Sequence, residues 1–492
     1  MAAAVVPAAS FELSTPVLRT GNPDVDIAFR IAIGDIAGNI ALYQSGLLDA
    51  PAPVLLAGLG YPTPWTRDAS MNSWNGLPVL SPAVARNTLM AVLENSAEGP
   101  RISGHDQYWD CIVWAEGAWQ YYLLTGDREF LSLALRAVTT TLAFLESTEF
   151  DSASGLFRGP GWSDGVSGYP DAYAGTNGAS GIQAWPRVNP ERASHPGFGI
   201  PMQALSTNCL YYNAYRRIDA MRAELGLSAD KQYAPKAARL REAINTRLWS
   251  SARQHYLFLT GPFGDSEHQE ALGHAYAILF GVANGERAGL VLEHQFVAPA
   301  GVPSVWPNYH RYRGQDGTGF ARHAGTVWPQ IQGMWALAAA SQGNAAKFGH
   351  ELFQLAGHAV RDRQFAELYH PLTGAIYGGW QERNGQMVLW EAKPRQSWAA
   401  TAYLAMVLRG LVGIEPTTEG IRISPCVPEG LHEVKLSNVR IRSTRLDLTV
   451  RGTGTKVQRL EVNGRERSPA SVLAWNELGS GPVIIAVTMA RL

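Results

Sequence analysis

The chain has 492 residues, which is longer than one ordinary domain and long enough to bury a large core. Its net charge of -1 and its 17% of charged residues leave no basic surface that would recruit nucleic acid, and no acidic tail. The three cysteines, Cys111, Cys209 and Cys426, are far apart and odd in number. They therefore indicate neither a disulfide framework nor a zinc site, and we expect no metal or other cofactor.

No stretch approaches about eighteen consecutive apolar residues, so we expect no membrane-spanning helix and no membrane partner. The first seven residues, Met1-Ala-Ala-Ala-Val-Val-Pro7, lack the basic region of a secretory signal. A chain that had lost its leader would look the same. The expected location is therefore cytoplasmic or periplasmic.

Between about residue 24 and residue 411, apolar residues recur at three- and four-residue spacing, which is typical of helices. Asp127 and Asn344, each preceded by a glycine, are expected to cap the helices that follow them, and Gly285 marks a similar turn. The predicted helices span 25–47, 81–97, 106–125, 128–147, 201–224, 232–249, 266–282, 286–296, 324–341, 345–362 and 395–411.

The connections between these helices alternate between tight turns and long loops rich in glycine, proline and tryptophan. The long loops are 51–80, 150–200, 297–323 and 363–393. Long loops within a compact domain are usually functional. About six hairpins with long loops at one end predict an (α/α)6 toroid over residues 1–413, with the long loops lining one mouth.

After residue 413 the periodicity changes to two, as in Val439-Arg-Ile-Arg-Ser443 and Arg445-Leu-Asp-Leu-Thr-Val450. The segment 457–462 runs into Asn463-Gly464, a pair typical of a tight hairpin turn. Residues 414–492 are therefore predicted to form a small all-β, sandwich-like module.

Glu367 lies in the loop Phe365-Ala-Glu-Leu-Tyr-His-Pro-Leu-Thr-Gly374, among rings and turn-forming residues. It is suited to accept a proton from water, with Tyr369 and His370 as orienting partners. The alternative is a glutamate at a helix end that faces solvent. Trp380, Gln381 and Glu391 follow before the last helix as possible substrate contacts, and Glu391 competes for the role of base.

Asp164 lies between glycines in Gly161-Trp-Ser-Asp-Gly165. Trp162 and Tyr169 would exclude water from its carboxyl group and raise its pKa, as a general acid requires. The alternative is a tight turn in which the aspartate bonds its own backbone. Two carboxylates in long loops of one face indicate acid and base catalysis on a sugar.

Three further segments supply candidate substrate contacts. In Tyr61 to Trp74, an arginine and an aspartate beside tryptophan offer donors and acceptors to vicinal hydroxyls, although a buried structural ion pair is the alternative. The segment His105 to Asp110 opens a predicted helix, where Asp106 is equally suited to cap it. One of the two later loop tryptophans is expected to stack on sugar. The candidates are Trp65, Arg67, Asp68, Asn72, Trp74, Asp106, Trp109, Asp110, Trp306 and Trp328.

The Glu367 loop, followed by Gln396-Ser-Trp398-Ala-Ala-Thr401, resembles the C-terminal signature of family 63 glycoside hydrolases, and more loosely that of family 37 trehalases. The resemblance covers roughly residues 50–411. It implies that Glu367 is the general base and Asp164 the general acid. Trp398 is a further candidate for substrate contact. These families usually carry the acid in Ser-Gly-aromatic-Asp, whereas this chain has one extra residue before Asp164.

The segment Pro64-Trp-Thr-Arg-Asp68 resembles a segment of bacterial glycogen-debranching-type and mannosylglycerate-hydrolase-like barrels. There the arginine and the aspartate hold hydroxyls of the nonreducing sugar. This resemblance implies that Arg67 and Asp68 bind substrate.

The expected function is that of an inverting, exo-acting glycoside hydrolase on α-linked glucosyl- or mannosyl-type residues of a small carbohydrate. The two carboxyl groups should then lie about 6.5–9.5 Å apart. Alternatives are an α-L-rhamnosidase, a phosphorylase, a non-catalytic carbohydrate-binding protein, or a lyase or epimerase with a base among His105, His310 and His323. The sequence leaves the oligomeric state open.

Overall fold

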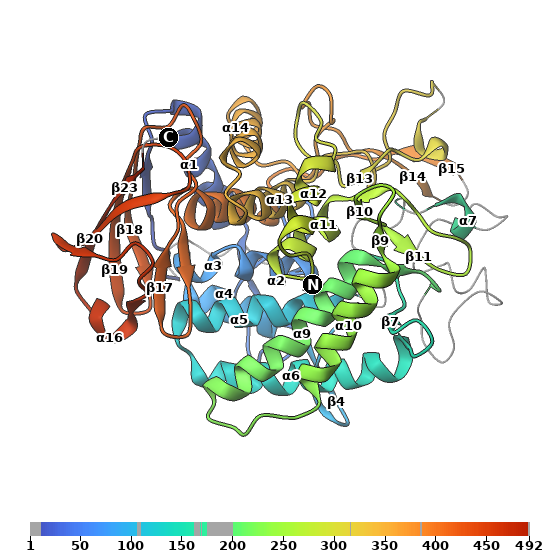
Figure 1. Ribbon diagram of the computed structural model, residues 1–492, viewed down its shortest axis with the longest axis horizontal. Coiled ribbons are helices and arrows are strands. Elements are labelled where there is room, and N and C mark those ends of the chain that lie inside the picture. The colour runs from blue at the N-terminus through green and yellow to red at the C-terminus, as the bar shows by residue number, and fades with distance from the viewer. Residues whose placement is uncertain are drawn as a thin grey trace.

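The computed structural model describes residues 11–105, 110–161, 168, 170–174, 200–314, 316–383 and 386–490. A helical part is followed by a β-rich region at one end of the molecule, the left-hand end in Figure 1. The helices are α1 (Pro23–Gly38), α2 (Thr66–Trp74), α3 (Leu77–Leu80), α4 (Pro82–Met90), α5 (Trp114–Thr125), α6 (Arg128–Glu149), α7 (Asp171–Ala174), α9 (Leu205–Glu224), α10 (Tyr233–Arg247), α11 (Ala271–Leu279), α12 (Glu286–His294), α13 (Pro329–Ser341), α14 (Ala345–Asp362), α15 (Ser397–Ala405) and α16 (Trp475–Leu478).

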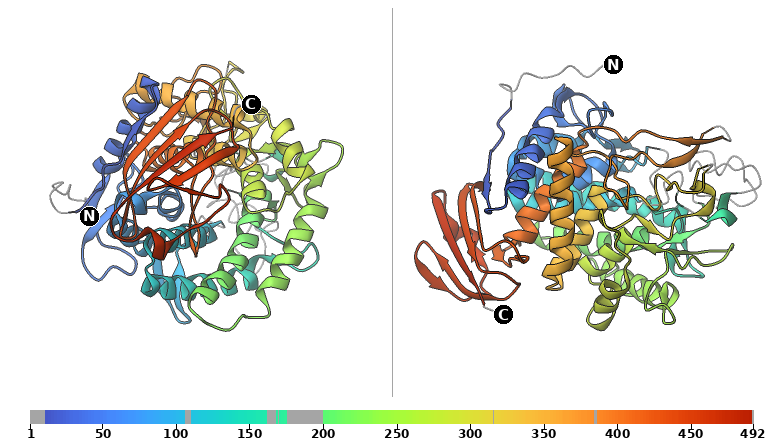
Figure 2. Two further views of the ribbon diagram at one scale, coloured as in Figure 1. Left: turned by 60° about the vertical axis from the view of Figure 1, so that its left-hand side comes forward. Right: turned by 90° about the horizontal axis from the view of Figure 1, so that it is seen from above.

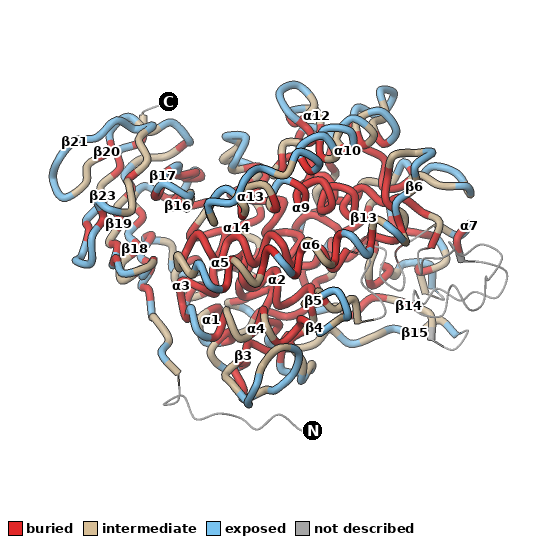
Figure 3. Tube along the Cα trace, turned by 90° about the horizontal axis from the view of Figure 1, so that it is seen from below, coloured by how far each residue is buried: buried red, intermediate tan, exposed pale blue. Residues whose placement is uncertain are grey.

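Six helices pack in a closed cycle and form the core of the helical part. Going round the cycle, each of α2, α5, α9, α11, α13 and α15 contacts the next, and α15 contacts α2 again. Most side chains of these helices are buried, as the continuous red tube in Figure 3 shows. Outside them, α4 packs on α2 and α5, α6 on α5 and α9, and α14 on α13. The predicted helical hairpins are confirmed for α5 with α6 and for α13 with α14.

Helix α2 differs most from what the sequence predicts. Residues 51–80 were expected to form a loop, but Thr66–Trp74 is an inner helix of the cycle. All nine of its residues are buried, but most of them are polar, so the segment lacks the recurring apolar residues from which the other helices were predicted. The expected helix 25–47 ends at Gly38, after which β2 (Ile40–Tyr43) pairs with β3 (Ala52–Leu55).

The predicted turn between α5 and α6 is confirmed in detail. Gly126 ends α5 with φ +75°, in the left-handed region that favours glycine. The Asp127 side chain then accepts a hydrogen bond from the Phe130 N–H group at 2.9 Å and another from the Tyr121 hydroxyl at 3.1 Å. Asn344 caps α14 in the same way, through the Lys347 N–H group at 3.0 Å.

Replacing Asp127 with alanine should destabilise the fold by about 1–2 kcal/mol, because it removes the cap of α6. Urea denaturation followed by circular dichroism measures this free energy of unfolding. The matched control is Glu129→Ala, whose side chain is 89% exposed and should change stability by no more than about 0.5 kcal/mol. Equal losses in the two variants would show that the cap contributes nothing.

Among the described residues, α6 is the one helix long and apolar enough to cross a membrane by length and composition. Half of the apolar 18-residue stretch in α6 is buried within the fold, where α6 packs against α5 and α9. A core helix passes the same test of length and composition.

The β-rich region begins at β16, directly after a π-helical turn (Met406–Leu411) that extends α15. One sheet has the order β1-β18-β19-β23-β20-β21, and a smaller one has the order β16-β17-β22. The strands are β1 (Val17–Arg19), β16 (Ile414–Pro416), β17 (Gly420–Ile423), β18 (Glu433–Ile441), β19 (Thr444–Arg451), β20 (Val457–Val462), β21 (Arg465–Arg467), β22 (Leu473–Ala474) and β23 (Pro482–Met489). Asn463 and Gly464 form the predicted tight turn, with φ of +50° and +75°.

The larger sheet differs from the expected division at residue 413 because its first strand comes from the N-terminal end of the chain. β1 pairs antiparallel with β18, with Val17 opposite Ser437. Figure 2 shows this N-terminal segment running alongside the sheet before α1 begins. A three-residue strand carries too little periodicity to be recognised in sequence.

Candidate functional site

The N-terminal ends of the inner helices meet at one end of the cycle, and polar side chains join them in pairs. Arg67 in the first turn of α2 binds Asp110, which precedes α5, with 2.7 Å between Nε and Oδ1. Ser206 at the start of α9 binds Glu270, which directly precedes α11. The Trp328 ring, before α13, lies edge-on to the Trp398 ring of α15. This end of the cycle therefore collects several buried charged groups, among them Arg67, Asp110 and Glu270.

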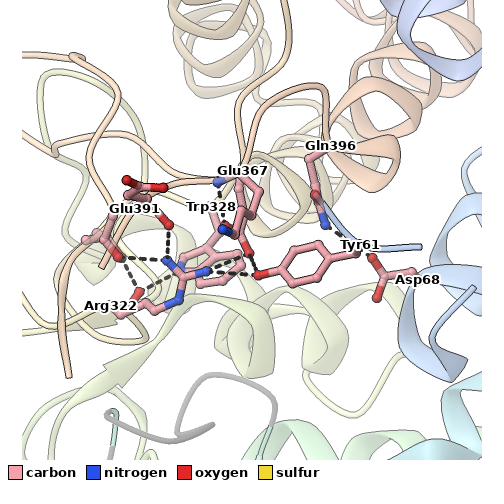
Figure 4. Close-up of polar contacts among 10 residues, drawn as sticks. Tyr61, Asp68, Arg322, Trp328, Glu367, Glu391 and Gln396 are labelled. Atoms are coloured by element: carbon pink, nitrogen blue, oxygen red, sulfur yellow. Dashed lines mark hydrogen bonds and ion pairs between the residues drawn. The ribbon is translucent and has the colours of Figure 1, made fainter. Parts of the chain in front are cut away.

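Glu367 is the centre of a buried polar cluster at this end (Figure 4). Its Oε1 atom accepts from the Arg322 guanidinium at 2.7 Å and from the Tyr61 hydroxyl at 2.9 Å. Its Oε2 atom accepts from the Lys393 backbone N–H group at 2.9 Å. All three partners are donors, so they fit the ionised carboxylate. Oε2 keeps a second lone pair that can accept a proton from water.

Arg322 is held by more than its ion pair with Glu367. Its Nη1 atom donates to the backbone carbonyls of Gly378 at 2.8 Å and Glu391 at 3.2 Å. Trp328 lies beside the guanidinium, with 5.4 Å from Cζ to the ring centroid, and its indole N–H group donates to the Arg322 carbonyl oxygen. A planar guanidinium fixed on several sides sets the orientation of the carboxylate it binds.

Asp68 lies on the other side of Tyr61 from Glu367 (Figure 4). Its Oδ1 atom is 3.4 Å from the Gln396 side-chain amide nitrogen, and its side chain is buried. Burial, and next the negative charge of Glu367, raise the pKa of Asp68 well above its usual value. The site thus combines one carboxylate held by donors with a second carboxyl group whose environment favours the protonated form.

Asp110 and His323 occupy the neighbouring part of the site. Burial raises the pKa of Asp110 although Arg67 opposes the change. Burial, together with the positive charges of Arg322 and Arg67, lowers the pKa of His323 well below its usual value. The imidazole is therefore neutral near pH 7, and it stacks on Trp328 with 5.3 Å between the ring centroids.

Glu270 is a fully buried carboxyl group of this end of the cycle that the sequence analysis did not select. Its Oε2 atom accepts from the Ser206 N–H group at 3.0 Å, and its Oε1 atom is 2.5 Å from the Ser206 hydroxyl. A Cβ atom on Gly161 or Gly273 would lie within 2.7 Å of its oxygens, so both glycines make room for it. Burial raises the pKa of Glu270 to about 8 although Ser206 opposes the change.

Glu270 should make the stability of the protein depend on pH. Because its folded-state pKa lies above the ordinary value of 4.5, its contribution is complete below pH 4.5 and is lost as the pH rises to about 8. The free energy of unfolding of the wild type minus that of Glu270→Gln should therefore fall over this window, by at most roughly 4–5 kcal/mol. The exposed Glu267 supplies the control, since Glu267→Gln should show no such decline. A flat difference for Glu270→Gln would contradict this account.

The structure brings some of the predicted site residues together and separates others. Trp65, Arg67, Asp68, Asp110, Trp328, Glu367 and Trp398 lie at the N-terminal end of the inner helices. Asn72 is one turn further along α2, where its side-chain oxygen accepts from the Thr401 hydroxyl at 2.7 Å. Asp164, Trp162, Tyr169, Asp106 and Trp109 lie outside the described residues.

Trp74 and Trp306 occupy positions that packing explains. Trp74 ends α2, about 12 Å along the helix from its first residue, and stacks on Tyr276 and Phe280 in the core. Trp306 stacks on Phe296 with 4.2 Å between the ring centroids.

The hairpin of β14 (Trp380–Arg383) and β15 (Gln386–Leu389) carries two further candidates, Trp380 and Gln381. Gly314 and Gly319 lie directly against the Trp380 ring, and the Trp380 backbone pairs with Phe320 and Arg322. Trp380 therefore borders the segment that supplies Arg322.

Glu391 is the competing candidate for the base, and only its backbone carbonyl reaches the cluster. That oxygen accepts from Arg322, whereas the carboxylate is exposed and turned away from Arg322 and Glu367 (Figure 4). The geometry therefore favours Glu367 over Glu391 as the base.

Sequence reasoning missed Arg322, Gln396 as a partner of Asp68, and Tyr61 as a donor to Glu367. Tyr61 begins the segment Tyr61 to Trp74, and Gln396 begins the segment Gln396 to Thr401. Both segments resemble parts of known glycosidases, so the two residues could have been recognised as candidates from their place in the sequence. Arg322 immediately precedes His323 and Gly325-Thr-Val-Trp-Pro329, and a lone arginine in a loop has no spacing that marks it. Within the described ranges, no group of three or more His, Cys, Asp or Glu side chains is arranged to hold a metal ion.

Comparison with known families assigns the helical part to enzymes that act on glycosides. Residues 61–399 match the mannosylglycerate hydrolase MGH1-like glycoside hydrolase domain. This match covers more than half of the 492 residues, so the chain belongs to that family. The resemblance to family 63 glycoside hydrolases is thereby confirmed.

Among curated proteins, solabiose phosphorylase of Paenibacillus borealis is 27% identical over 255 residues. The aligned part is 47% of this chain and 32% of that protein, so the chain matches about a third of this relative's length. This relative is named as a phosphorylase, whereas the matching family is named as a glycoside hydrolase.

Solved structures share the fold at low sequence identity. A sialidase aligns with a TM-score of 0.66 and 16% identity, covering 93% of this chain and 41% of that one. A family 78 rhamnosidase of a Bacillus species aligns with a TM-score of 0.60 and 14% identity, covering 97% and 44%. A family 63 mannosylglycerate hydrolase from Thermus thermophilus, in complex with glucose, gives a TM-score of 0.57 and 14% identity, covering 77% and 100%.

Proposed function

We propose that the protein is an inverting, exo-acting glycoside hydrolase that removes α-linked glucosyl- or mannosyl-type residues from a small carbohydrate. In this proposal the cycle of inner helices is an (α/α)6 toroid, Glu367 is the general base and Asp164 is the general acid. The observation that carries the proposal is the set of three donors on Glu367. All three groups donate to the carboxylate, and Oε2 keeps a lone pair for a water molecule.

The proposed reaction is a single displacement. The water oxygen attacks the anomeric carbon, and one proton of that water passes to Glu367 Oε2. The bond from the anomeric carbon to the leaving oxygen breaks, and Asp164 supplies the proton that the leaving oxygen takes up. Exchange with solvent then returns Glu367 to its ionised form and Asp164 to its protonated form.

Phosphorolysis is the second candidate, because a phosphorylase is 27% identical over part of the chain. A phosphorylase must bind phosphate where the hydrolase holds water, and Arg322 is the guanidinium that contacts Glu367. Its Nη1 and Nη2 groups are already committed to two backbone carbonyls and to Glu367. The anionic Glu367 would also repel phosphate, so the geometry favours hydrolysis.

A panel of α-glucosides, α-mannosides and α-L-rhamnosides, assayed with and without inorganic phosphate, tests the proposal. We expect a free sugar to be released from a gluco- or manno-configured substrate in phosphate-free buffer. Release only in the presence of phosphate, with a sugar phosphate as product, would establish the second candidate. Turnover of rhamnosides alone would overturn the proposed substrate class.

A further inference from the structure

The loop that carries Glu367 runs beside the segment 391–397, and backbone contacts join the two. The Glu367 N–H group donates to the Lys393 carbonyl at 2.9 Å, and the Gln396 N–H group donates to the Phe365 carbonyl at 2.8 Å. The Lys393 N–H group donates to the Glu367 carboxylate itself. A shift of either segment would therefore move the carboxylate and one of its donors together.

Both segments are bound to the outer helix α1, which packs against α14 and α15 (Figure 2). The Asp35 side chain of α1 accepts from the Phe365 N–H group at 2.8 Å, two residues before Glu367. The side chain of Asn39, the residue directly after α1, donates to the Arg395 carbonyl at 2.7 Å and to the Ser397 hydroxyl at 2.9 Å. Asp35 in the last turn of α1 and Asn39 at its C-terminal end therefore hold the two segments from the same helix end.

Arg395 shows that this attachment holds the backbone in an unfavourable conformation. Its φ of +46° lies in the left-handed region, which costs a residue with a side chain on the order of 1–2 kcal/mol. The Asn39 side chain binds its carbonyl, and the Gln364 side chain accepts from its N–H group at 3.1 Å. Its guanidinium is 3.8 Å from the Asp35 carboxylate.

Asp35 itself is buried in a setting that only partly compensates its charge. Burial raises the pKa of Asp35 to about 6, although the Phe365 N–H group and Arg395 favour the ionised form. A buried, weakly compensated carboxylate is a costly way to stabilise a fold. Its contacts instead fix Phe365, at the start of the loop that carries Glu367, and Arg395 in the neighbouring segment 391–397.

We propose that Asp35 is a positioning residue for Glu367: through the Phe365 N–H group, helix α1 sets where the base carboxylate lies. That Glu367 acts as the base rests on the proposed function, whereas the inference that Asp35 sets the position of Glu367 does not. The Asp35 side chain does not itself contact Glu367. It acts through the backbone of the loop, by way of the Phe365 N–H group.

Amide hydrogen exchange tests the positional part without any substrate. In Asp35→Ala, exchange in peptides covering 363–369 and 391–397 should quicken about tenfold, because a buried hydrogen bond is lost. Asp35→Asn keeps an acceptor for the Phe365 N–H group and should restore most of the protection. The matched control is Asp26→Ala on the same helix, whose carboxylate accepts from the Thr20 N–H group and lies away from the base loop. Unchanged exchange in Asp35→Ala would overturn the inference, whatever reaction the protein catalyses.

Kinetics on the best substrate of the glycoside panel test whether Asp35 acts through Glu367. In Asp35→Ala, kcat should fall roughly 10- to 100-fold while KM changes less than about threefold, since a displaced base lowers turnover more than binding. Adding Asp35→Ala to Glu367→Gln should lower the residual rate no further. An equal fold-loss in both backgrounds would overturn the inference. Full activity of Glu367→Gln would instead overturn the proposed function, and the exchange result would still decide whether Asp35 positions the loop.

Discussion

Replacing Glu367 with glutamine is expected to lower kcat for glycoside hydrolysis by about 10²–10⁴-fold, the usual contribution of a general base. Glutamine has nearly the same shape, and its carbonyl oxygen can take the place of Oε1, which accepts from Tyr61 and Arg322. Its NH2 group, in the place of Oε2, can neither take a proton from water nor accept from the Lys393 N–H group. The measurement is steady-state kinetics, with circular dichroism to show that the variant is folded.

Glu391→Gln is the matched control for this variant. Its carboxylate is exposed and turned away from the cluster, and the carbonyl that Arg322 uses is unaffected by the substitution. It should keep near wild-type activity. If Glu391→Gln lost the activity and Glu367→Gln kept it, the assignment of the base would be reversed.

Replacing Arg322 with methionine should destabilise the protein by about 3–5 kcal/mol, because it leaves the buried Glu367 carboxylate without its cation. Activity should fall as well, since the orientation of the carboxylate depends on the guanidinium. Urea denaturation measures the stability, and the double variant with Glu367→Gln should lose less than the sum of the two single losses.

The exposed pair of Arg253 and Glu267 supplies the comparison for Arg322. These side chains are 59% and 51% exposed, and such surface pairs contribute about 0–1 kcal/mol. Arg253→Met should therefore change stability little. A loss of similar size in Arg253→Met and Arg322→Met would contradict the view that burial makes the Arg322 pair important.

The sequence predicted the outer helices and the turns well because their signals are local. Helix α6 alternates buried and exposed faces, and Gly126 with Asp127 marks its start by known capping chemistry. Helix α2 escaped detection because most of its residues are polar although all of them are buried, so it lacks the recurring apolar residues that mark a helix in sequence. Strand β1 was missed because only pairing with β18, over four hundred residues away in the chain, defines it.

The sequence predicted that the site holds carboxylates and aromatic rings, but it identified only some of the residues that form it. Glu367 stood out because its loop has a recognisable pattern, and Asp68 stood out because of the separate segment Pro64-Trp-Thr-Arg-Asp68. Arg322, Glu270 and Asp35 were missed because each gains its importance from a partner far away in the chain, at Glu367, Ser206 and Phe365. Long-range pairing of this kind leaves no periodic or local trace in a single sequence.

The central claim, that Glu367 activates a water for single displacement, is tested most directly by proton NMR of the first sugar released from an α-glycoside in phosphate-free buffer. The account predicts that the β-anomer appears first and then equilibrates by mutarotation, because water attacks the face opposite the leaving group. If the α-anomer appeared first, or if no sugar were released until phosphate was added, the account would be contradicted.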